Sequence, residues 1–274
     1  MINTLSGLPY RSEFTNSYGI HSYHGDLLRR FRCKFQDRQS IPWFTYTEYS
    51  GIQPRAVSLQ NASSSQHLCG GTIISPYYAL TAAHCVQSNE DQYVLQLNNY
   101  CVPEGAKFPT ATVKKIIKHE KFDPVTKAHD IALLRITLHL CDKSWLKEQI
   151  LPKSSFGLSG ECTIYGYGFQ DLETKETSTE LLAGKLEIVS LDECRRELGP
   201  YVAPDYDSGM ICAVGEGVDA CQGDSGSPLI CSRGKLEGIS SYGMSCAVPG
   251  LPGVYTSVAA HLNWIRENMK YYAP

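Results

Sequence analysis

The sequence predicts an all-β protein, and three observations carry this prediction. Short apolar runs, several of them alternating with polar residues, recur from about Val57 towards the C-terminus. Gly, Pro, Asn, Asp and Ser separate the runs, and these residues are typical of turns between strands. Only the C-terminal segment has a clear helical period. This pattern is typical of an all-β barrel or a sandwich, and it leaves the choice between them open.

Seven apolar runs are the clearest candidates for strands. They cover residues 56–59, 93–97, 113–117, 131–136, 162–167, 186–189 and 229–231. Residues 257–272 are expected to form a helix, because apolar residues recur there at helical spacing: Val258, Leu262, Ile265 and Met269. One face of this helix would pack on the β structure.

The chain is expected to divide near residue 42. Residues 1–41 are polar, rich in tyrosine and serine, and contain a cluster of basic residues, so we interpret them as an N-terminal extension or a propeptide-like segment. Residues 42–274 are expected to form the folded protein. Of the 274 residues in the chain, 42% are hydrophobic, which is enough for a sizeable core.

Composition also limits the partners and the location of the protein. The net charge of -3, without basic clusters that interleave with aromatic residues, argues against nucleic acid. No apolar run approaches the length of a membrane span, so no membrane partner is expected. Eleven cysteines indicate an oxidising compartment. We therefore expect a secreted, extracellular protein, although no signal peptide is visible and the N-terminus reads as incomplete or atypical.

Signals for metals and cofactors are weak. The cysteines form no Cys-x-x-Cys pair of the kind found in structural zinc or redox sites. His119-Glu120 lacks the second histidine of a metalloprotease helix. The sequence therefore predicts no metal site and no cofactor.

The run Gly-Asp-Ser-Gly-Ser-Pro at 223–228 is the strongest chemical signal. It places Ser225 among residues too small to shield it, which is typical of a nucleophile. A serine hydroxyl attacks poorly unless a base takes its proton and backbone donors stabilise the oxyanion. His84, in the run Leu-Thr-Ala-Ala-His-Cys, is the candidate base. Asp130, at the start of an apolar run, is the candidate acid that orients it.

These three motifs, in the order His84, Asp130, Ser225, resemble the trypsin and chymotrypsin family of serine proteases. The resemblance extends from about residue 42 to the C-terminus. It implies two packed six-stranded antiparallel β-barrels with a C-terminal α-helix. It also implies that Ser225 attacks the peptide carbonyl, that His84 transfers the proton and that Asp130 orients His84. The oxyanion hole would be formed by the N–H groups of Gly223 and Ser225.

The same resemblance implies a specificity pocket. Asp219 matches the position at the floor of the pocket that selects arginine or lysine, and Ala220 adds little polarity beside it. Ser241 would support Asp130 and offer backbone to the substrate, while Gly243 and Gly253 would leave the pocket open. The expected substrates are proteins or peptides cleaved after Arg or Lys, and protein protease inhibitors and an activating protease are further candidate partners.

Disulfides are implied by the resemblance as well. The expected pairs are Cys69–Cys85, Cys162–Cys231, Cys194–Cys212 and Cys221–Cys246. Three cysteines are then left over, and the sequence does not decide how they pair: Cys33, Cys101 and Cys141.

The chain also departs from the family pattern. The family acid that matches Asp224 normally pairs with a freed Ile-Val-Gly-Gly terminus, but the corresponding stretch here, 41–44, is Ile-Pro-Trp-Phe. Asp224 therefore has an expected role as activation or structural acid without a visible partner. Ser227 replaces the second glycine of the usual Gly-Asp-Ser-Gly-Gly-Pro. Lys107 stands about where a calcium-binding carboxylate often sits, so no calcium site is expected.

Two other functions stay open. A protease homologue without catalytic activity could act as a binding or regulatory module, because the usual activation terminus is missing. An α/β-hydrolase esterase could use Ser225, Glu237 and His261, but Ser227 breaks the Gly-x-Ser-x-Gly elbow of that class. Asn61-Ala62-Ser63 is a glycosylation sequon that would matter only in a secreted chain.

Overall fold

A computed structural model describes most of the chain after residue 54. The described residues are 55–97, 109–139, 146, 149–153, 160–168, 177–178, 181–216, 219–231, 234–244, 248 and 250–271. The predicted N-terminal extension lies outside these residues, so its boundary near residue 42 stays a prediction. The same is true of Cys33, Cys101, Cys141 and Lys107.

Six antiparallel strands close the first barrel. They are β1 (Ala56–Asn61), β2 (His67–Ser75), β3 (Tyr78–Thr81), β4 (Tyr93–Gln96), β5 (Thr110–Lys118) and β6 (Ala132–Leu138). Their order around the barrel is β1-β2-β3-β6-β5-β4. Alternating side chains fill the interior, and Leu59, Ile73 and Leu95 are fully buried there.

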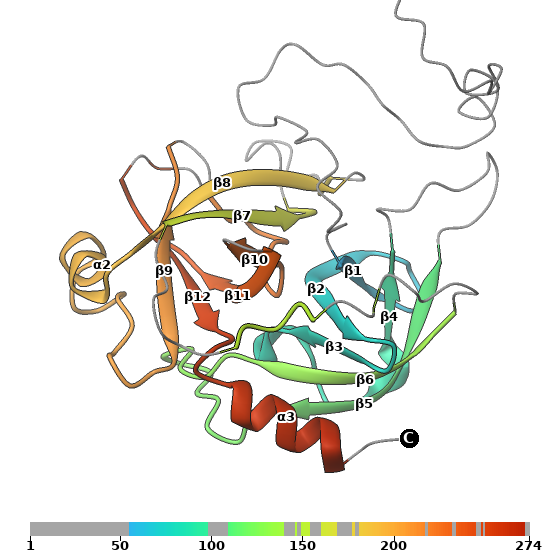
Figure 1. The fold of residues 1–274 in the computed structure, drawn as a ribbon. Helices are drawn as coiled ribbons and strands as arrows, with labels where there is room; N and C mark the ends of the chain where they lie inside the picture. The colour runs from blue at the N-terminus through green and yellow to red at the C-terminus, as the bar shows by residue number, and fades with distance from the viewer. Residues whose placement is uncertain are drawn as a thin grey trace, which may run out of the picture.

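The second barrel has the same number of strands. They are β7 (Gly160–Gly166), β8 (Leu182–Val189), β9 (Met210–Val214), β10 (Pro228–Cys231), β11 (Lys235–Tyr242) and β12 (Gly253–Ser257). The closed order is β10-β11-β12-β9-β8-β7. The two barrels lie side by side, with α3 below them and close to β5 and β6 (Figure 1). This arrangement confirms the predicted fold of two six-stranded antiparallel barrels and excludes the α/β-hydrolase alternative.

One hydrophobic cluster joins the barrels and the C-terminal helix. It includes Leu80 and Leu133 of the first barrel, Ile239 of the second, and Ile265 of the helix, all with no exposed surface. Such burial of apolar surface is the main favourable contribution to folding. The interface between the barrels is therefore part of the core, and it fixes the relative positions of loops from the two barrels.

Two α-helices and two short 3₁₀ turns complete the described structure. The 3₁₀ turns are η2 (Ala83–Cys85) and η3 (Glu90–Gln92). Helix α2 (Leu191–Leu198), which the apolar pattern does not single out, begins after Ser190, whose Oγ accepts the Glu193 N–H at 3.1 Å. This is a typical N-cap.

The C-terminal helix α3 (Leu262–Tyr271) begins later than the predicted residue 257. Residues 258–261 form a turn instead, in which the His261 N–H donates to the Val258 carbonyl at 3.1 Å. Val258 is nevertheless fully buried, so the apolar period continues beyond the helix and makes the helix look longer than it is. Among the described helices, none combines the length and the apolar character needed to cross a membrane.

Three of the disulfides implied by the resemblance are present: Cys69–Cys85, Cys162–Cys231 and Cys194–Cys212. Cys221 is also disulfide-bonded, while Cys246 lies outside the described residues. Bridges that persist like these are typical of oxidising compartments.

Candidate active site

His84 and Asp130 form a close polar pair. His84 lies in η2, directly after β3, and Asp130 lies at the end of the loop between β5 and β6. Nδ1 of His84 is 2.6 Å from Oδ2 of Asp130, and the backbone N–H of His84 donates to Oδ1 at 2.9 Å. Two bonds to one carboxylate fix both the position and the plane of the imidazole ring.

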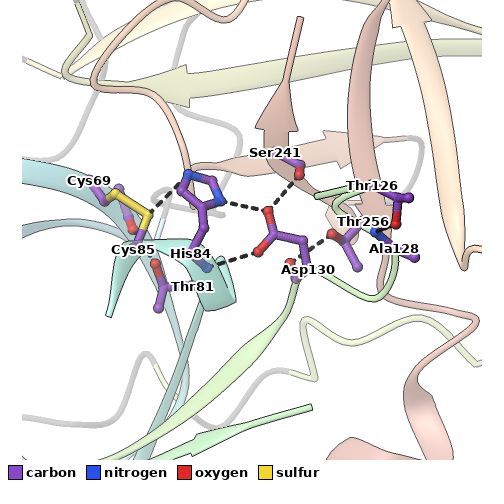
Figure 2. A network of polar contacts seen from close by, with 10 residues as sticks. Cys69, Thr81, His84, Cys85, Thr126, Ala128, Asp130, Ser241 and Thr256 are labelled. Atoms are coloured by element: carbon purple, nitrogen blue, oxygen red, sulfur yellow. Dashed lines mark hydrogen bonds and ion pairs between the residues drawn. A yellow bond between two sulfur atoms is a disulfide. The ribbon is translucent and has the colours of Figure 1, made fainter. Parts of the chain in front are cut away.

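Asp130 is held by the second barrel as well as the first. Oγ of Ser241, in β11, donates to Oδ2 at 2.6 Å, and Oγ1 of Thr256, in β12, donates to the backbone carbonyl of Asp130 at 2.8 Å. Figure 2 shows these side chains converging on Asp130 from the side opposite His84. The carboxylate itself has no exposed surface.

The pKa of Asp130 is set by two opposing effects. Burial by itself raises the pKa of the carboxyl group, but hydrogen bonds from His84 and Ser241 together outweigh burial and bring the pKa below its usual value. Asp130 is therefore ionised at neutral pH. An ionised carboxylate accepts the Nδ1–H of His84, which leaves the lone pair on Nε2.

Ser225 lies in the loop before β10, and backbone bonds attach this loop to the first barrel. The Gly70 N–H of β2 donates to the Ser225 carbonyl at 2.7 Å, and β2 and β3 are paired strands. Gly226 has a φ of 83° and a β-carbon there would lie 2.3 Å from Oγ1 of Thr81, so only glycine fits. No hydrogen bond joins Oγ of Ser225 to His84 in the described residues; such bonds are often long before substrate binds.

The backbone around Ser225 provides two unused donors. The N–H groups of Asp224 and Gly226 donate to the carbonyls of Cys221 and Ser240 at 2.9 and 2.7 Å. In contrast, the N–H groups of Gly223 and Ser225 have no acceptor within the described part of the chain. Gly223 has a φ of 96°, a conformation that favours glycine. The N–H groups of Gly223 and Ser225, two residues apart in one loop, could both donate to an oxyanion.

A network of side-chain hydrogen bonds that the sequence analysis did not predict holds the carbonyl of Gly223. Nε2 of His67 donates to the Gly223 carbonyl at 2.8 Å, and Nδ1 accepts from Oγ of Ser58 at 2.7 Å. Nε2 of Gln60 in turn donates to Oγ of Ser58 at 3.1 Å. Burial lowers the pKa of His67, so the ring is neutral as this network requires. No motif marks His67, because its partner is 156 residues away.

Asp224 is buried between two backbone segments. Its Oδ1 accepts the Gly168 N–H at 2.8 Å and its Oδ2 accepts the Cys221 N–H at 2.9 Å. A β-carbon at Gly166 or Gly168 would lie about 2 Å from the carboxylate, at 1.9 and 2.2 Å, so both glycines make room for it. Burial raises the pKa of Asp224 to about 6 despite these hydrogen bonds. No cation contacts this carboxylate among the described residues.

The residues of the expected pocket lie together. Oδ1 of Asp219 accepts the Ala220 N–H at 2.7 Å. A β-carbon at Gly253 would lie 2.7 Å from Oδ1 of Asp219, and one at Gly243 would lie 3.7 Å from Oδ2. The two glycines therefore border Asp219 and add no side chain of their own beside its carboxylate.

Comparison with known proteins shows which family has this architecture. A sequence model of the family described as Trypsin matches residues 43–265. The chain belongs to the trypsin family. It is 36% identical to Trypsin II-P29 of Gallus gallus over 239 residues, which cover 86% of the chain and 91% of that protein. Neuropsin, a serine protease expressed in the limbic system of mouse brain, has a similar structure, with a TM-score of 0.67 and 30% identity over 79% of this chain and 95% of the other.

Some trypsin-family relatives are much longer than this chain. Serine protease 56 of Mus musculus is 36% identical over 237 residues, which cover 81% of this chain but only 38% of that protein. The chain therefore spans well under half the length of this relative. The similarity covers only that part of the relative.

Glu237 and His261, the residues that an α/β-hydrolase would use with Ser225, do not form a catalytic site with it. Glu237 lies within β11, and His261 lies in the turn before α3. The ring nitrogens of His261 contact the Ser257 carbonyl and Nδ1 of His129, not Ser225.

Ser227, the departure from the trypsin-family motif, has a hydroxyl that is buried and has no hydrogen-bond partner in the described structure. We expect Ser227→Ala to raise the free energy of unfolding by about 1 kcal/mol, because an unpaired buried hydroxyl is costly. Urea unfolding of variants that also carry Ser225→Ala measures this. Ser257→Ala is the control and is expected to lower the free energy of unfolding, because it removes the Oγ that accepts the Ala260 N–H at 3.2 Å. A loss of stability in Ser227→Ala would contradict the prediction.

Proposed function

We propose that the protein is a serine endopeptidase that cleaves peptide bonds after Arg or Lys. Ser225 is the nucleophile, His84 the general base and acid, and Asp130 the residue that orients His84. The main support is the geometry of the His84–Asp130 pair. A buried carboxylate bound to both the backbone and Nδ1 of His84 leaves Nε2 as the basic nitrogen.

The reaction would proceed through an acyl-enzyme. Nε2 of His84 takes the proton of Ser225 as Oγ attacks the peptide carbonyl, and the N–H groups of Gly223 and Ser225 bind the resulting oxyanion. His84 then gives the proton to the leaving amine and the C–N bond breaks. A water molecule attacks the ester in the same manner and releases the acid, which restores Ser225 and His84. Asp130 stays ionised throughout.

Specificity for Arg or Lys rests on Asp219. A carboxylate bordered by glycines offers a long cationic side chain both room and a charge partner, and charge-assisted hydrogen bonds are among the stronger ones. Gly243, Gly253 and Ala220 contribute little bulk, and Ser241 would hold the substrate strand through its backbone. Protein or peptide substrates with Arg or Lys follow from this arrangement.

Activation would depend on Asp224. A buried carboxylate with a raised pKa is stabilised by a cation, and a new amino terminus formed by an activating protease would supply one. Residues 1–41 are the candidate propeptide-like segment, and the disulfides support a secreted location. Protein protease inhibitors that present Arg or Lys would bind to the same cleft.

The test combines N-terminal sequencing of the secreted protein with hydrolysis of fluorogenic peptides that end in Arg, Lys or Phe. We expect Arg and Lys peptides to be cleaved, Ser225→Ala to be inactive, and Asp219→Ser to lose the preference for a cation. Activity that persists in Ser225→Ala would reject the mechanism. A mature, folded protein that cleaves none of the peptides would favour the catalytically silent homologue that acts as a binding or regulatory module.

A further inference from the structure

Three histidines outside the triad meet at the junction of the two barrels. His119 follows β5, His129 precedes Asp130 in the loop between β5 and β6, and His261 ends the turn before α3. They line a cavity of about 390 Å³ together with Glu120, Asp207 and Trp264. The first two histidines belong to the first barrel, whereas His261 follows the last strand of the second.

The three rings lie close to one another, although those of His119 and His129 are stacked with an interplanar angle of 14°. One nitrogen of each ring lies within 4.8 Å of the others. The shortest separation, between Nδ1 of His129 and Nε2 of His261, is 3.0 Å. Nitrogen ligands of a tetrahedral zinc ion are about 3.3 Å apart at Zn–N distances of about 2.0 to 2.1 Å. The His129–His261 pair is thus already near this spacing, whereas the His119 ring must turn out of its stack on His129 to bring a nitrogen to the same ion.

Hydrogen bonds prepare His261 to bind a metal. Its Nδ1 lies 2.6 Å from the Ser257 carbonyl, which can only accept, so Nδ1 carries the proton and Nε2 has the lone pair. A ligating histidine normally donates its other N–H to a carbonyl or carboxylate in this manner. His129 must then donate its Nδ1 proton to Nε2 of His261. A metal ion would replace that shared proton, and His129 would take up its proton on Nε2.

His119 needs the largest adjustment. Its Nδ1 accepts the Lys121 N–H at 3.2 Å, and either of its ring nitrogens can bind a metal only if this one long hydrogen bond is given up. The ring is stacked on His129, with centroids 4.9 Å apart, so it stays beside the other two. This hydrogen bond is longer than the His129–His261 and His261–Ser257 contacts of the cluster, at 3.0 and 2.6 Å, so giving it up is expected to cost little.

Charge and burial favour neutral imidazoles, which are the form that binds metals. His119 and His261 are only 8% and 3% exposed. The carboxylates of Glu120 and Asp207 lie at the same cavity and offset the charge of a bound cation, whereas Lys121 opposes it. Glu120 also receives the Trp264 indole N–H at 2.9 Å, which orients it.

We propose that His119, His129 and His261 bind a zinc ion, with water or a neighbouring carboxylate as the fourth ligand. Three imidazoles and one open position suit zinc. The sequence analysis expected no metal site, because the chain has no Cys-x-x-Cys pair and His119-Glu120 lacks the second histidine of a metalloprotease helix. A second group of candidate ligands, Cys69, His84 and Cys85, is unsuitable because both cysteines are in a disulfide.

The binding test uses the full chain carrying Ser225→Ala, so that self-cleavage cannot interfere. Calorimetric titration with zinc chloride is expected to give one ion per chain and a rise in the melting temperature. His119→Gln and His129→Asn should each weaken binding at least about 10-fold. Asparagine is chosen because His129 has a φ of 53°, which asparagine tolerates. Circular dichroism without zinc verifies that each variant is folded.

Two control variants locate the ion. His139→Gln removes an exposed histidine, and His84→Ala removes the imidazole of the candidate triad; both should bind zinc as the parent does. Cobalt(II) in place of zinc should give visible absorption bands that His129→Asn loses. The proposal is overturned if the folded parent does not bind zinc at millimolar concentration, if His119→Gln and His129→Asn bind normally, or if His84→Ala alone abolishes binding.

A zinc ion here would lie one residue from Asp130. His129 is in a left-handed conformation, and its N–H donates to the Ser208 carbonyl at 2.9 Å. A displacement of its ring on zinc binding is therefore expected to shift the backbone next to Asp130. Zinc is therefore expected to reduce peptide hydrolysis, a step that rests on the proposed function. The ratio of rates with and without saturating zinc should fall for the parent and stay near one for His119→Gln. An unchanged ratio for the parent would reject this coupling, whereas absence of hydrolysis before zinc is added would count against the proposed function.

Discussion

Asp130→Asn is expected to reduce kcat for an Arg peptide by about 10⁴-fold while the fold is retained, a magnitude known from the serine-protease triad. Asparagine has nearly the same shape but carries an amide NH₂ group in place of one carboxylate oxygen. The amide cannot accept from His84 and Ser241 at the same position, where Oδ2 now accepts both. His84 would then present the wrong tautomer, with a proton on Nε2, and could not take the proton of Ser225.

The measurement is single-substrate kinetics on the activated protein, with circular dichroism to verify the fold. Ser241→Ala is the matched control, because it removes one of the hydrogen bonds to Oδ2 and leaves the carboxylate in place. A much smaller loss is expected for this variant. If Asp130→Asn retained more than about a tenth of the activity, Asp130 would not be the residue that orients His84.

Asp224 is expected to make the unactivated chain less stable as the pH rises. The pKa of its carboxyl group is about 6 in the folded state and 3.8 in the unfolded state, so the folded state holds the proton longer. This proton favours folding at pH 4. The benefit is lost as the pH rises through 6, and it amounts to about 3 kcal/mol of unfolding free energy.

Comparison with Asp224→Asn isolates this effect from the buried histidines, whose lowered pKa values act in the opposite direction. Urea unfolding between pH 4 and pH 7 should show that the parent loses about 2 kcal/mol relative to Asp224→Asn, since part of the full effect falls below pH 4. Asp205→Asn, at a carboxylate with 77% exposure, should follow the parent closely. If the parent instead gained stability relative to Asp224→Asn, a cation would already be paired with Asp224 in the unactivated chain.

Much of the fold could be predicted from apolar patterning. Runs such as 131–136 and 162–167 correspond to β6 and β7, because strands that fill a barrel alternate between interior and exterior. Helix α2 was not predicted, because five of its eight residues are charged and too few apolar residues remain to show a helical period. The start of α3 was predicted too early, because Val258 is buried in a turn and not in a helix.

Parts of the site were predictable for a different reason. Ser225, His84 and Asp130 each lie in a local motif, so short stretches of sequence were enough to name them. His67 and the cluster of His119, His129 and His261 have no such motif. Their partners come from distant segments, and only the packing of the barrels brings them within hydrogen-bond distance.

The sequence by itself therefore determined the all-β class from local patterns and, through the resemblance to the trypsin family, the two barrels, the residues of the candidate triad and the acid of the expected pocket. The tertiary structure decided which groups are buried and what they contact. It surrounded Asp130 with donors from both barrels but left Asp224 without a cation among the described residues. The physical reason is that burial and electrostatic environment depend on long-range packing, which no single stretch of the chain encodes.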